Sequence, residues 1–162
     1  MISDERNHQV DPSAPKSRVP WLTAMRKQST ALTSSFSSLE HALALLVQPD
    51  HDDREMYAEF FHHEGLAAIC VSSAREAMPI APYVDVIITG LRLHDEINGI
   101  ELIASLKHDK RTQTIPIVVL TACAWSTERE RAETAGCDVF LTKPCLPCEL
   151  LRELRRLLAC SK

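Results

Sequence analysis

One short apolar run, Asp85-Val86-Ile87-Ile88-Thr89-Gly90, constrains the fold of this chain more than any other segment. Its middle is rich in β-branched residues, and polar, turn-forming residues follow it. A run of this length between turn signals is typical of a strand that is buried on both faces, as in parallel sheets. Ligands of such sheets bind beyond the carboxyl ends of the strands. The residue at that end would carry the chemistry, and here it is a glycine.

Strand and helix patterns alternate five times along the chain. We expect strands at residues 42–47, 66–71, 84–88, 115–120 and 138–142, each followed by an amphipathic helix. Alternation at this spacing predicts an α/β domain in which right-handed crossovers build a parallel sheet covered on both faces. Periodicity alone leaves the order of the strands open.

Charge and hydropathy exclude several classes of protein. The net charge of −4 does not indicate the basic surface that is typical of a nucleic-acid-binding protein. No apolar run reaches the length of about 18 residues that a membrane span needs. The first residues include Asp4 and Glu5 and lack the apolar core of a secretory signal. We therefore expect a cytoplasmic protein whose six cysteines are reduced thiols.

Residues 1–40 differ from the rest in composition. They are rich in Ser, Thr, Pro, Lys and Arg and have few large apolar side chains. Such a segment cannot bury enough surface to offset the entropy lost on ordering. We predict a flexible N-terminal tail at residues 1–40 and a folded domain at residues 41–162. Trp21, Leu22 and Met25 are spaced like one face of a helical turn, which leaves open a transient helix without a role or a segment that docks a partner.

Four positions should meet at the carboxyl edge of the sheet, because the ends of parallel strands one, three, four and five gather there. They are Gln48-Pro49-Asp50, Gly90, Thr121 and Lys143. A threonine hydroxyl and a lysine cation at one edge are suited to holding the oxygens of a phosphoryl group.

At this point the chain resembles a known family, the receiver domain of two-component response regulators, from about residue 42 to residue 160. The matching segments are Val47 with Asp52-Asp53-Arg54-Glu55, Asp85-Val86-Ile87-Ile88, Asn98-Gly99-Ile100-Glu101-Leu102, residues 115–122, Ala135-Gly136-Cys137-Asp138 and Leu141-Thr142-Lys143-Pro144. The resemblance implies a flavodoxin-like, three-layer (βα)5 sandwich with strand order 2-1-3-4-5. It also implies phosphorelay signalling, in which a histidine kinase phosphorylates an aspartate at the end of strand three and an acidic pair after strand one holds Mg²⁺.

The sequence departs from the family pattern at the decisive positions. The acidic pair falls on Gln48 and Pro49, and the phospho-acceptor falls on Gly90. Mg²⁺ needs oxygen ligands, normally with one or two carboxylates, and proline offers none. Glycine offers no nucleophile. We therefore expect that the Mg²⁺ site is lost, that the protein needs no metal or other cofactor, and that no aspartate is phosphorylated.

Other parts of the family's phosphoryl site remain. Asp50, Thr121 and Lys143 are the residual phosphoryl-site residues, and the resemblance makes Phe140 the switch aromatic. We expect Asp52 to cap the helix after strand one. Asp50 is then expected to form a salt bridge with Lys143 in the space that a phosphoryl group occupies elsewhere.

The cysteines support an alternative reading. Cys145-Leu146-Pro147-Cys148 places a C-x-x-C motif at the start of the last helix, where the helix N-terminus lowers a thiol pKa. Cys123 follows strand four and is expected to approach Cys145. Cys137 should lie at the opposite end of the sheet, so one tetrahedral zinc site cannot use all of these thiols. A thiol-based redox or metal sensor on the same scaffold is thus the alternative function.

The preferred interpretation is an atypical single-domain response regulator that is not an enzyme and acts by protein–protein contacts without phosphorylation. Its expected partner is a histidine kinase or another signalling protein, bound at the face formed by the domain's fourth helix, fifth strand and fifth helix; a homodimer is a further option. A nucleotide-binding enzyme ranks last, because no Gly-rich loop follows strand one and the chain has only four glycines.

Overall fold

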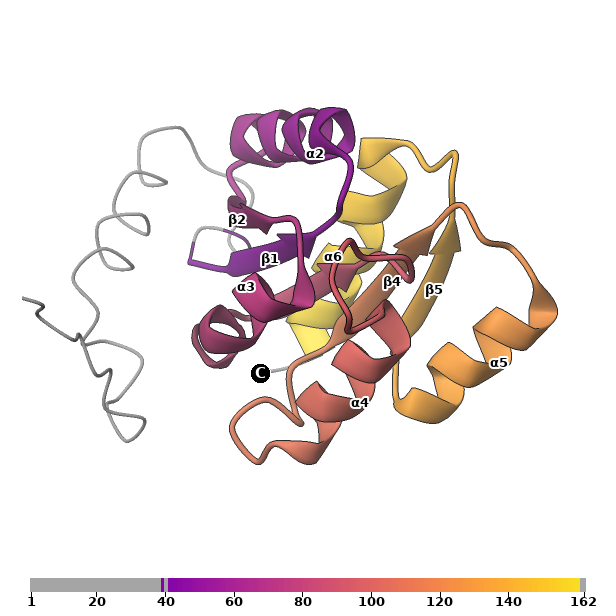
Figure 1. The fold of residues 1–162 in the computed structure, drawn as a ribbon. Coiled ribbons are helices and arrows are strands. Elements are labelled where there is room, and N and C mark those ends of the chain that lie inside the picture. Colours follow the sequence, from indigo (N-terminus) through magenta and orange to yellow (C-terminus); the bar gives the residue numbers. More distant parts are fainter. Residues whose placement is uncertain (1–38, 40, 161–162) are drawn as a thin grey trace, which may run out of the picture.

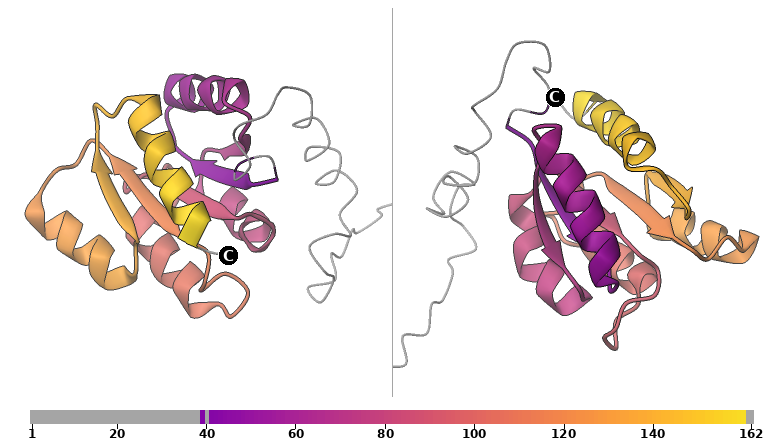
Figure 2. Two further views of the ribbon diagram at one scale, coloured as in Figure 1. Left: turned by 180° about the vertical axis from the view of Figure 1, so that it is seen from behind. Right: turned by 90° about the horizontal axis from the view of Figure 1, so that it is seen from above.

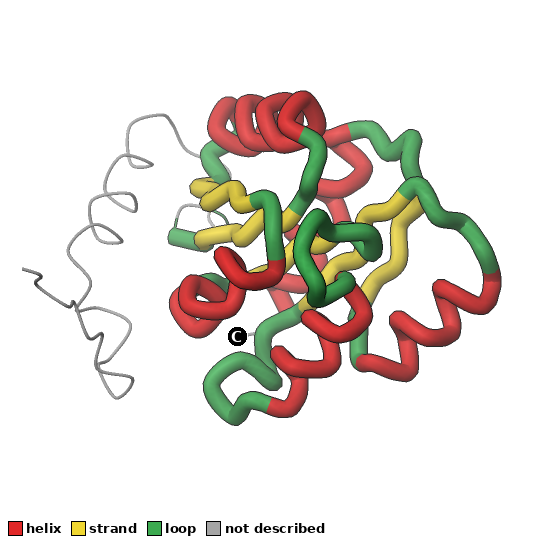
Figure 3. Tube along the Cα trace, viewed as in Figure 1, coloured by secondary structure: helices red, strands yellow, loops and turns green. Residues whose placement is uncertain are grey.

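A computed structural model describes residue 39 and residues 41–160 of the chain (Figure 1). Helices and strands alternate along it, and loops follow the strand ends (Figure 3). The elements are β1 (Leu43–Val47), α2 (His51–His63), β2 (Ala67–Val71), α3 (Ala74–Ile80), the 3-10 turn η2 (Ala81–Tyr83), β3 (Val86–Thr89), α4 (Gly99–His108), β4 (Ile117–Thr121), α5 (Ser126–Ala135), β5 (Val139–Thr142) and α6 (Pro147–Cys160).

The five strands form one parallel sheet in the order β2-β1-β3-β4-β5. This order confirms the flavodoxin-like topology that the resemblance implies. Every residue of β1, β3 and β4 is buried, whereas the edge strands β2 and β5 are mostly half-buried. The apolar run from which the sequence analysis starts is therefore the central strand, as its lack of alternation predicts.

Helices cover both faces of the sheet, which makes three layers. The apolar residues of α3, α4 and α5 pack on one face, together with Leu45, Ile87 and Val119. Those of α2 and α6 pack on the other face, and α6 lies in front of the sheet when the molecule is seen from behind (Figure 2). Side chains alternate between the two faces along each strand, so each strand contributes to both cores.

The folded core begins slightly earlier than the sequence predicts. Leu39 falls in the segment predicted to be a tail, yet its side chain is only 1% exposed and packs in the core beneath α2 and α6. Its carbonyl accepts a hydrogen bond from the Ala42 N–H at 3.0 Å. The rest of the predicted tail, including Trp21, lies outside the described residues. Within residues 41–160, no helix is both long and apolar enough to cross a membrane.

The start of α2 corrects one prediction. Asp50, and not Asp52, is the N-cap: its side chain accepts a hydrogen bond from the Asp53 N–H at 2.9 Å. Asp52 lies inside the helix, and its side chain is almost fully exposed. Asp50 stands three residues before Asp53, and Asp52 stands three residues before Glu55. Both acidic residues suit the first turn of a helix, so the capping pattern alone could not choose between the two caps. The earlier cap places Asp53 in the first turn of the helix.

Candidate functional site

Backbone hydrogen bonds continue past the strands and fix the predicted site residues at the carboxyl edge of the sheet. The Gly90 N–H donates to the Val47 carbonyl at 3.0 Å, and the Lys143 N–H donates to the Thr121 carbonyl at 2.8 Å. Gln48 directly follows Val47. The structure therefore brings Gln48, Gly90 and Lys143 to one edge, as the sequence predicts.

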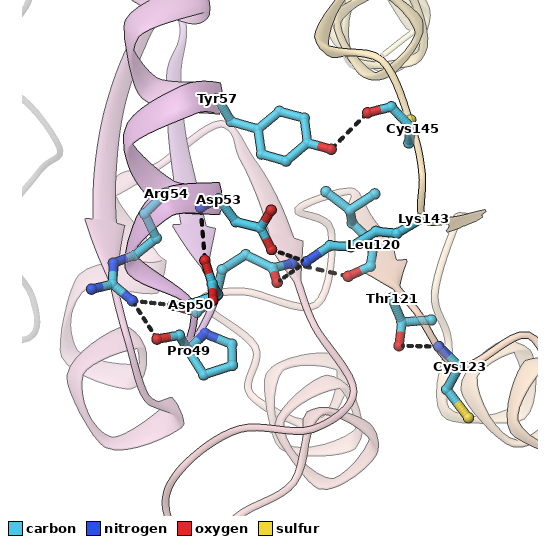
Figure 4. Close-up of polar contacts among 11 residues, drawn as sticks. Pro49, Asp50, Asp53, Arg54, Tyr57, Leu120, Thr121, Cys123, Lys143 and Cys145 are labelled. Atoms are coloured by element: carbon cyan, nitrogen blue, oxygen red, sulfur yellow. Dashed lines mark hydrogen bonds and ion pairs between the residues drawn. The ribbon is translucent and has the colours of Figure 1, made fainter.

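Lys143 is held by two side chains. Its ammonium donates to Gln48 Oε1 at 3.0 Å and to Asp53 Oδ2 at 2.5 Å (Figure 4). The Lys143 and Asp53 side chains are 21% and 29% exposed, so water screens this ion pair only partly. We call Gln48, Asp53 and Lys143 the lysine cluster. It joins the end of β1, the first turn of α2 and the residue that follows β5.

The carboxamide of Gln48 suits its position chemically. Its Nε2 donates to the Leu120 carbonyl at 3.0 Å, while its Oε1 accepts from Lys143. Gln48 is only 2% exposed, so both of its polar ends need partners within the protein. A carboxylate of the same length would turn an acceptor toward the Leu120 carbonyl, which is also an acceptor. An amide satisfies both neighbours, because it carries a donor and an acceptor.

The Gln48 amide closely approaches the space in front of Gly90. A Cβ atom added to Gly90 would lie 3.2 Å from Gln48 Oε1 and 3.5 Å from Gln48 Nε2. The first of these contacts is tighter than an ordinary van der Waals contact. Gly90 thus lacks a nucleophile, and the Gln48 amide would have to shift by a few tenths of an ångström to admit a side chain at position 90.

The ion pair with Lys143 corrects a second prediction. The predicted partner of Lys143 is Asp50, but the partner in the structure is Asp53. Asp50 is exposed and acts as the helix cap, and the hydrogen bond from the Asp53 N–H is the main reason that its pKa lies below the usual value. Sequence reasoning missed Asp53 because the cap was placed two residues too late. With the cap at Asp50, Asp53 becomes a first-turn residue on the helix that follows β1.

Thr121 is the last residue of β4, and Phe140 lies in β5. Thr121 is 5% exposed, and its Oγ1 accepts a hydrogen bond from the Cys123 N–H at 3.1 Å. Phe140 is 8% exposed and packs against the core under α5. The guanidinium carbon of Arg129, on α5, lies 4.7 Å from the centre of the Phe140 ring. This cation–π contact, which no local sequence pattern indicated, adds to the packing of the ring against α5.

The C-x-x-C cysteines differ in exposure. Cys145 is buried, and burial, followed by the nearby Glu149 carboxylate, raises the pKa of its thiol. A raised pKa is the opposite of what a reactive thiol needs. Cys148 is exposed. Cys123 and Cys145 lie on opposite sides of Lys143 in Figure 4, and no group of three His, Cys, Asp or Glu side chains within the described residues could hold a metal ion.

Two further residues tie the loops of the site in place. Arg54 donates to the Gln48 carbonyl at 2.6 Å and to the Pro49 carbonyl at 2.8 Å, which fixes the loop between β1 and α2. Tyr57, on α2, donates its hydroxyl to the Cys145 carbonyl at 2.7 Å. Both belong to the helix that carries Asp53, so α2 is fastened to the loops on either side of the lysine cluster.

The buried Tyr57 hydroxyl predicts a pH dependence of stability. Burial raises the pKa of Tyr57 from 10.0 to about 12. The unfolded chain therefore loses this proton before the folded protein does, so the stabilisation from Tyr57 is complete below the unfolded pKa of about 10 and is lost as the pH rises toward about 12. Urea unfolding of the wild type should show this decline.

The control for this prediction is Tyr57→Phe. Leaving the Cys145 carbonyl without its donor should cost about 1–3 kcal/mol at neutral pH. The variant should lose stability less steeply than the wild type between about pH 10 and 12, because it lacks the hydroxyl that the unfolded chain ionises before the folded protein does. Equal slopes for the two proteins would contradict the assignment to Tyr57.

Comparison with known proteins identifies similar domains. The family model for the response regulator receiver domain matches residues 44–155. Among curated proteins, the polar-differentiation response regulator DivK of Brucella ovis is 26% identical over 102 residues, which is 62% of this chain and 82% of that protein.

Solved structures of receiver domains are also similar to this chain. The signal receiver domain of a signal transduction histidine kinase from Syntrophus aciditrophicus is 28% identical, with a TM-score of 0.69, and the match covers 75% of this chain and 92% of that one. The receiver domain of a sensor histidine kinase from Pseudomonas aeruginosa, which holds a magnesium ion in its active-site cleft, is 25% identical, with a TM-score of 0.67 over 73% of this chain and 98% of that one.

Proposed function

Because the chain belongs to the family of response regulator receiver domains, we propose that it is a signalling module that acts through protein contacts and accepts no phosphoryl group on an aspartate. The lysine cluster carries this proposal. Lys143 already has a carboxylate and an amide oxygen as partners, and neither comes from the position of the acceptor. Within the protein's own structure, Asp53 supplies the negative charge that a phosphorylated aspartate supplies elsewhere in the family.

The residues at this edge do not fit the Mg²⁺ ion that the family's phosphoryl chemistry uses. Oxygen ligands, normally including carboxylates, would have to come from positions 48, 49 and 90. Gln48 Oε1 is committed to Lys143, Pro49 has no side-chain oxygen, and Gly90 has no side chain. The proposed mechanism therefore includes no metal-dependent step and assigns the protein no enzymatic activity.

Signalling without phosphate requires a partner that binds one conformation of the domain better than another. We place the contact face on α5, β5 and α6, as the family resemblance suggests. Two large apolar side chains are exposed at the loops that enter α5 and α6: Trp125 is 70% exposed and Leu146 is 61% exposed. Exposed aromatic residues of this kind are common anchors of protein interfaces.

The test uses the full chain as bait in an extract of its native host, with and without prior treatment with acetyl phosphate and Mg²⁺. The proposal predicts that a histidine kinase or another signalling protein is captured equally well in both cases. Capture that appears only after phosphodonor treatment would overturn it.

Trp125→Ala should weaken the binding of that captured partner by about 2 kcal/mol, or roughly thirtyfold in Kd, because truncation of an exposed aromatic anchor typically costs this much. Met56→Ala is the matched control: Met56 is 44% exposed but lies on α2, outside the proposed face. Affinities measured by calorimetry with the purified partner decide the matter. Equal losses in the two variants would move the contact face away from α5.

A further inference from the structure

A second feature lies beside the lysine cluster but does not include its residues. A cavity of about 160 Å³ opens between the loop after β3, the start of α4 and the first turns of α5. Its polar lining includes Arg92, Asn98, Cys123, Glu128 and Arg131. The Cys123 sulfur points away from Lys143 in Figure 4. The cavity is therefore a separate feature of the same end of the sheet.

The charge of this cavity is positive on balance. Arg92 and Arg131 contribute two cations from different elements, and Glu128 contributes the one carboxylate of the lining. Glu128 and Arg131 are 3.5 Å apart, three residues apart on an exposed helix face, where such pairs contribute little. No salt bridge to Arg92 occurs within the described part of the chain. Arg92 thus lines the cavity without a carboxylate partner among the described residues.

The backbone adds to this positive potential. Asn98 and Ile100 line the cavity and belong to the cap and first turn of α4, a helix of 10 residues. The N-terminal end of a helix carries a partial positive charge and amide N–H groups that favour anions. Two arginines and a helix N-terminus therefore converge from three separate segments.

We propose that this cavity binds a small oxyanion of the phosphate-monoester class between Arg92 and Arg131. The planar guanidinium group suits such ligands, because it can donate two parallel hydrogen bonds to a phosphate or carboxylate. The cavity volume is below the range of about 300–1,000 Å³ that is typical of pockets for drug-sized ligands, so the ligand is a small anion and not a nucleotide. This inference does not depend on whether the domain is phosphorylated.

Cys123 lines the cavity, so the rate at which its thiol is alkylated measures the charge preference of the cavity. Iodoacetate and iodoacetamide both alkylate a thiolate with loss of iodide, and they differ in that iodoacetate carries a negative charge. We expect the ratio of the iodoacetate rate to the iodoacetamide rate at Cys123 to exceed the ratio at the exposed Cys148 by about fivefold, the effect of one unit charge at close range in water. Peptide mapping by mass spectrometry gives both ratios from the same sample.

Substitutions identify the source of the charge preference. Arg92→Gln and Arg131→Gln should each bring the rate ratio at Cys123 down toward that of Cys148. Arg152→Gln, which changes an exposed arginine on α6, is the matched control and should leave the ratio unchanged. Circular dichroism of each variant checks that it is folded. A ratio at Cys123 that equals the ratio at Cys148 in the wild type, or that survives both substitutions, would overturn the proposal.

The second part of the test is the protection that inorganic phosphate gives Cys123 against alkylation. Phosphate should slow the alkylation of Cys123 by neutral iodoacetamide and leave Cys148 unaffected, while potassium acetate and potassium chloride at the same ionic strength should protect less. Equal protection by all three salts would indicate screening without a site and would contradict the proposal. Protection by acetate as strong as that by phosphate would contradict the phosphate class.

Discussion

Phosphorylation should be restored by replacing Gln48, Pro49 and Gly90 together with aspartate, and not by replacing Gly90 alone. In the single variant Gly90→Asp, the new side chain starts 3.2 Å from Gln48 Oε1, and no carboxylate pair is present to hold Mg²⁺. The triple variant removes the Gln48 amide from this space and supplies the carboxylates. The expected difference in the rate of labelling by acetyl phosphate is on the order of 10²-fold or more, the cost of losing one electrostatic stabiliser of a transition state.

Intact-mass spectrometry in the presence of Mg²⁺ measures this difference, and loss of the added mass in mild base identifies an acyl phosphate. The double variant Gln48→Asp with Pro49→Asp is the matched control, because it carries the carboxylate pair and retains Gly90. It should remain unlabelled. Labelling of Gly90→Asp at the rate of the triple variant would show that the Gln48 amide does not block the acceptor position.

A loss of stability is expected from Asp53→Asn. This substitution removes the negative charge of Asp53 from a partly buried ion pair. The hydrogen bond from Lys143 to Gln48 Oε1 remains. Hydrogen bonds to charged groups contribute about 1.5–3 kcal/mol to stability, and the partial exposure of this pair places the expected loss nearer to about 1–2 kcal/mol. Urea unfolding measures the loss.

Asp52→Asn is the matched control for Asp53→Asn. Asp52 stands on the same turn of α2, and its side chain is 99% exposed. Its substitution should change stability by less than about 0.5 kcal/mol, as for most surface positions. A double-mutant cycle with Lys143→Met then isolates the coupling between Asp53 and Lys143. Equal effects of the two asparagine variants, or zero coupling, would mean that the lysine cluster does not stabilise the fold.

The sequence predicted much of this architecture because its signals are local. The uninterrupted apolar runs predicted the buried central strands. The strand order came from the family resemblance and not from periodicity, since a crossover of given length can lead to more than one neighbouring strand. The edge that gathers Gln48, Gly90 and Lys143 followed from the rule that parallel strands end together.

The partners within the site were harder to predict because they depend on distant contacts. Asp53 and Lys143 are 90 positions apart, and which acidic side chain of the β1–α2 segment reaches the lysine depends on where α2 starts. Because the N-cap is Asp50 and not Asp52, the side chain that pairs with Lys143 is Asp53 and not Asp50. The cation–π contact of Arg129 with Phe140 likewise depends on the packing of α5 against β5, which no local pattern encodes.

The most direct measurement is the treatment of the wild-type protein with acetyl phosphate and Mg²⁺, followed by intact-mass spectrometry. The engagement of Lys143 by Gln48 and Asp53, together with the glycine at position 90, predicts an unchanged mass under conditions that label the triple aspartate variant. A base-labile phosphoryl group on any aspartate of the wild type would contradict the account.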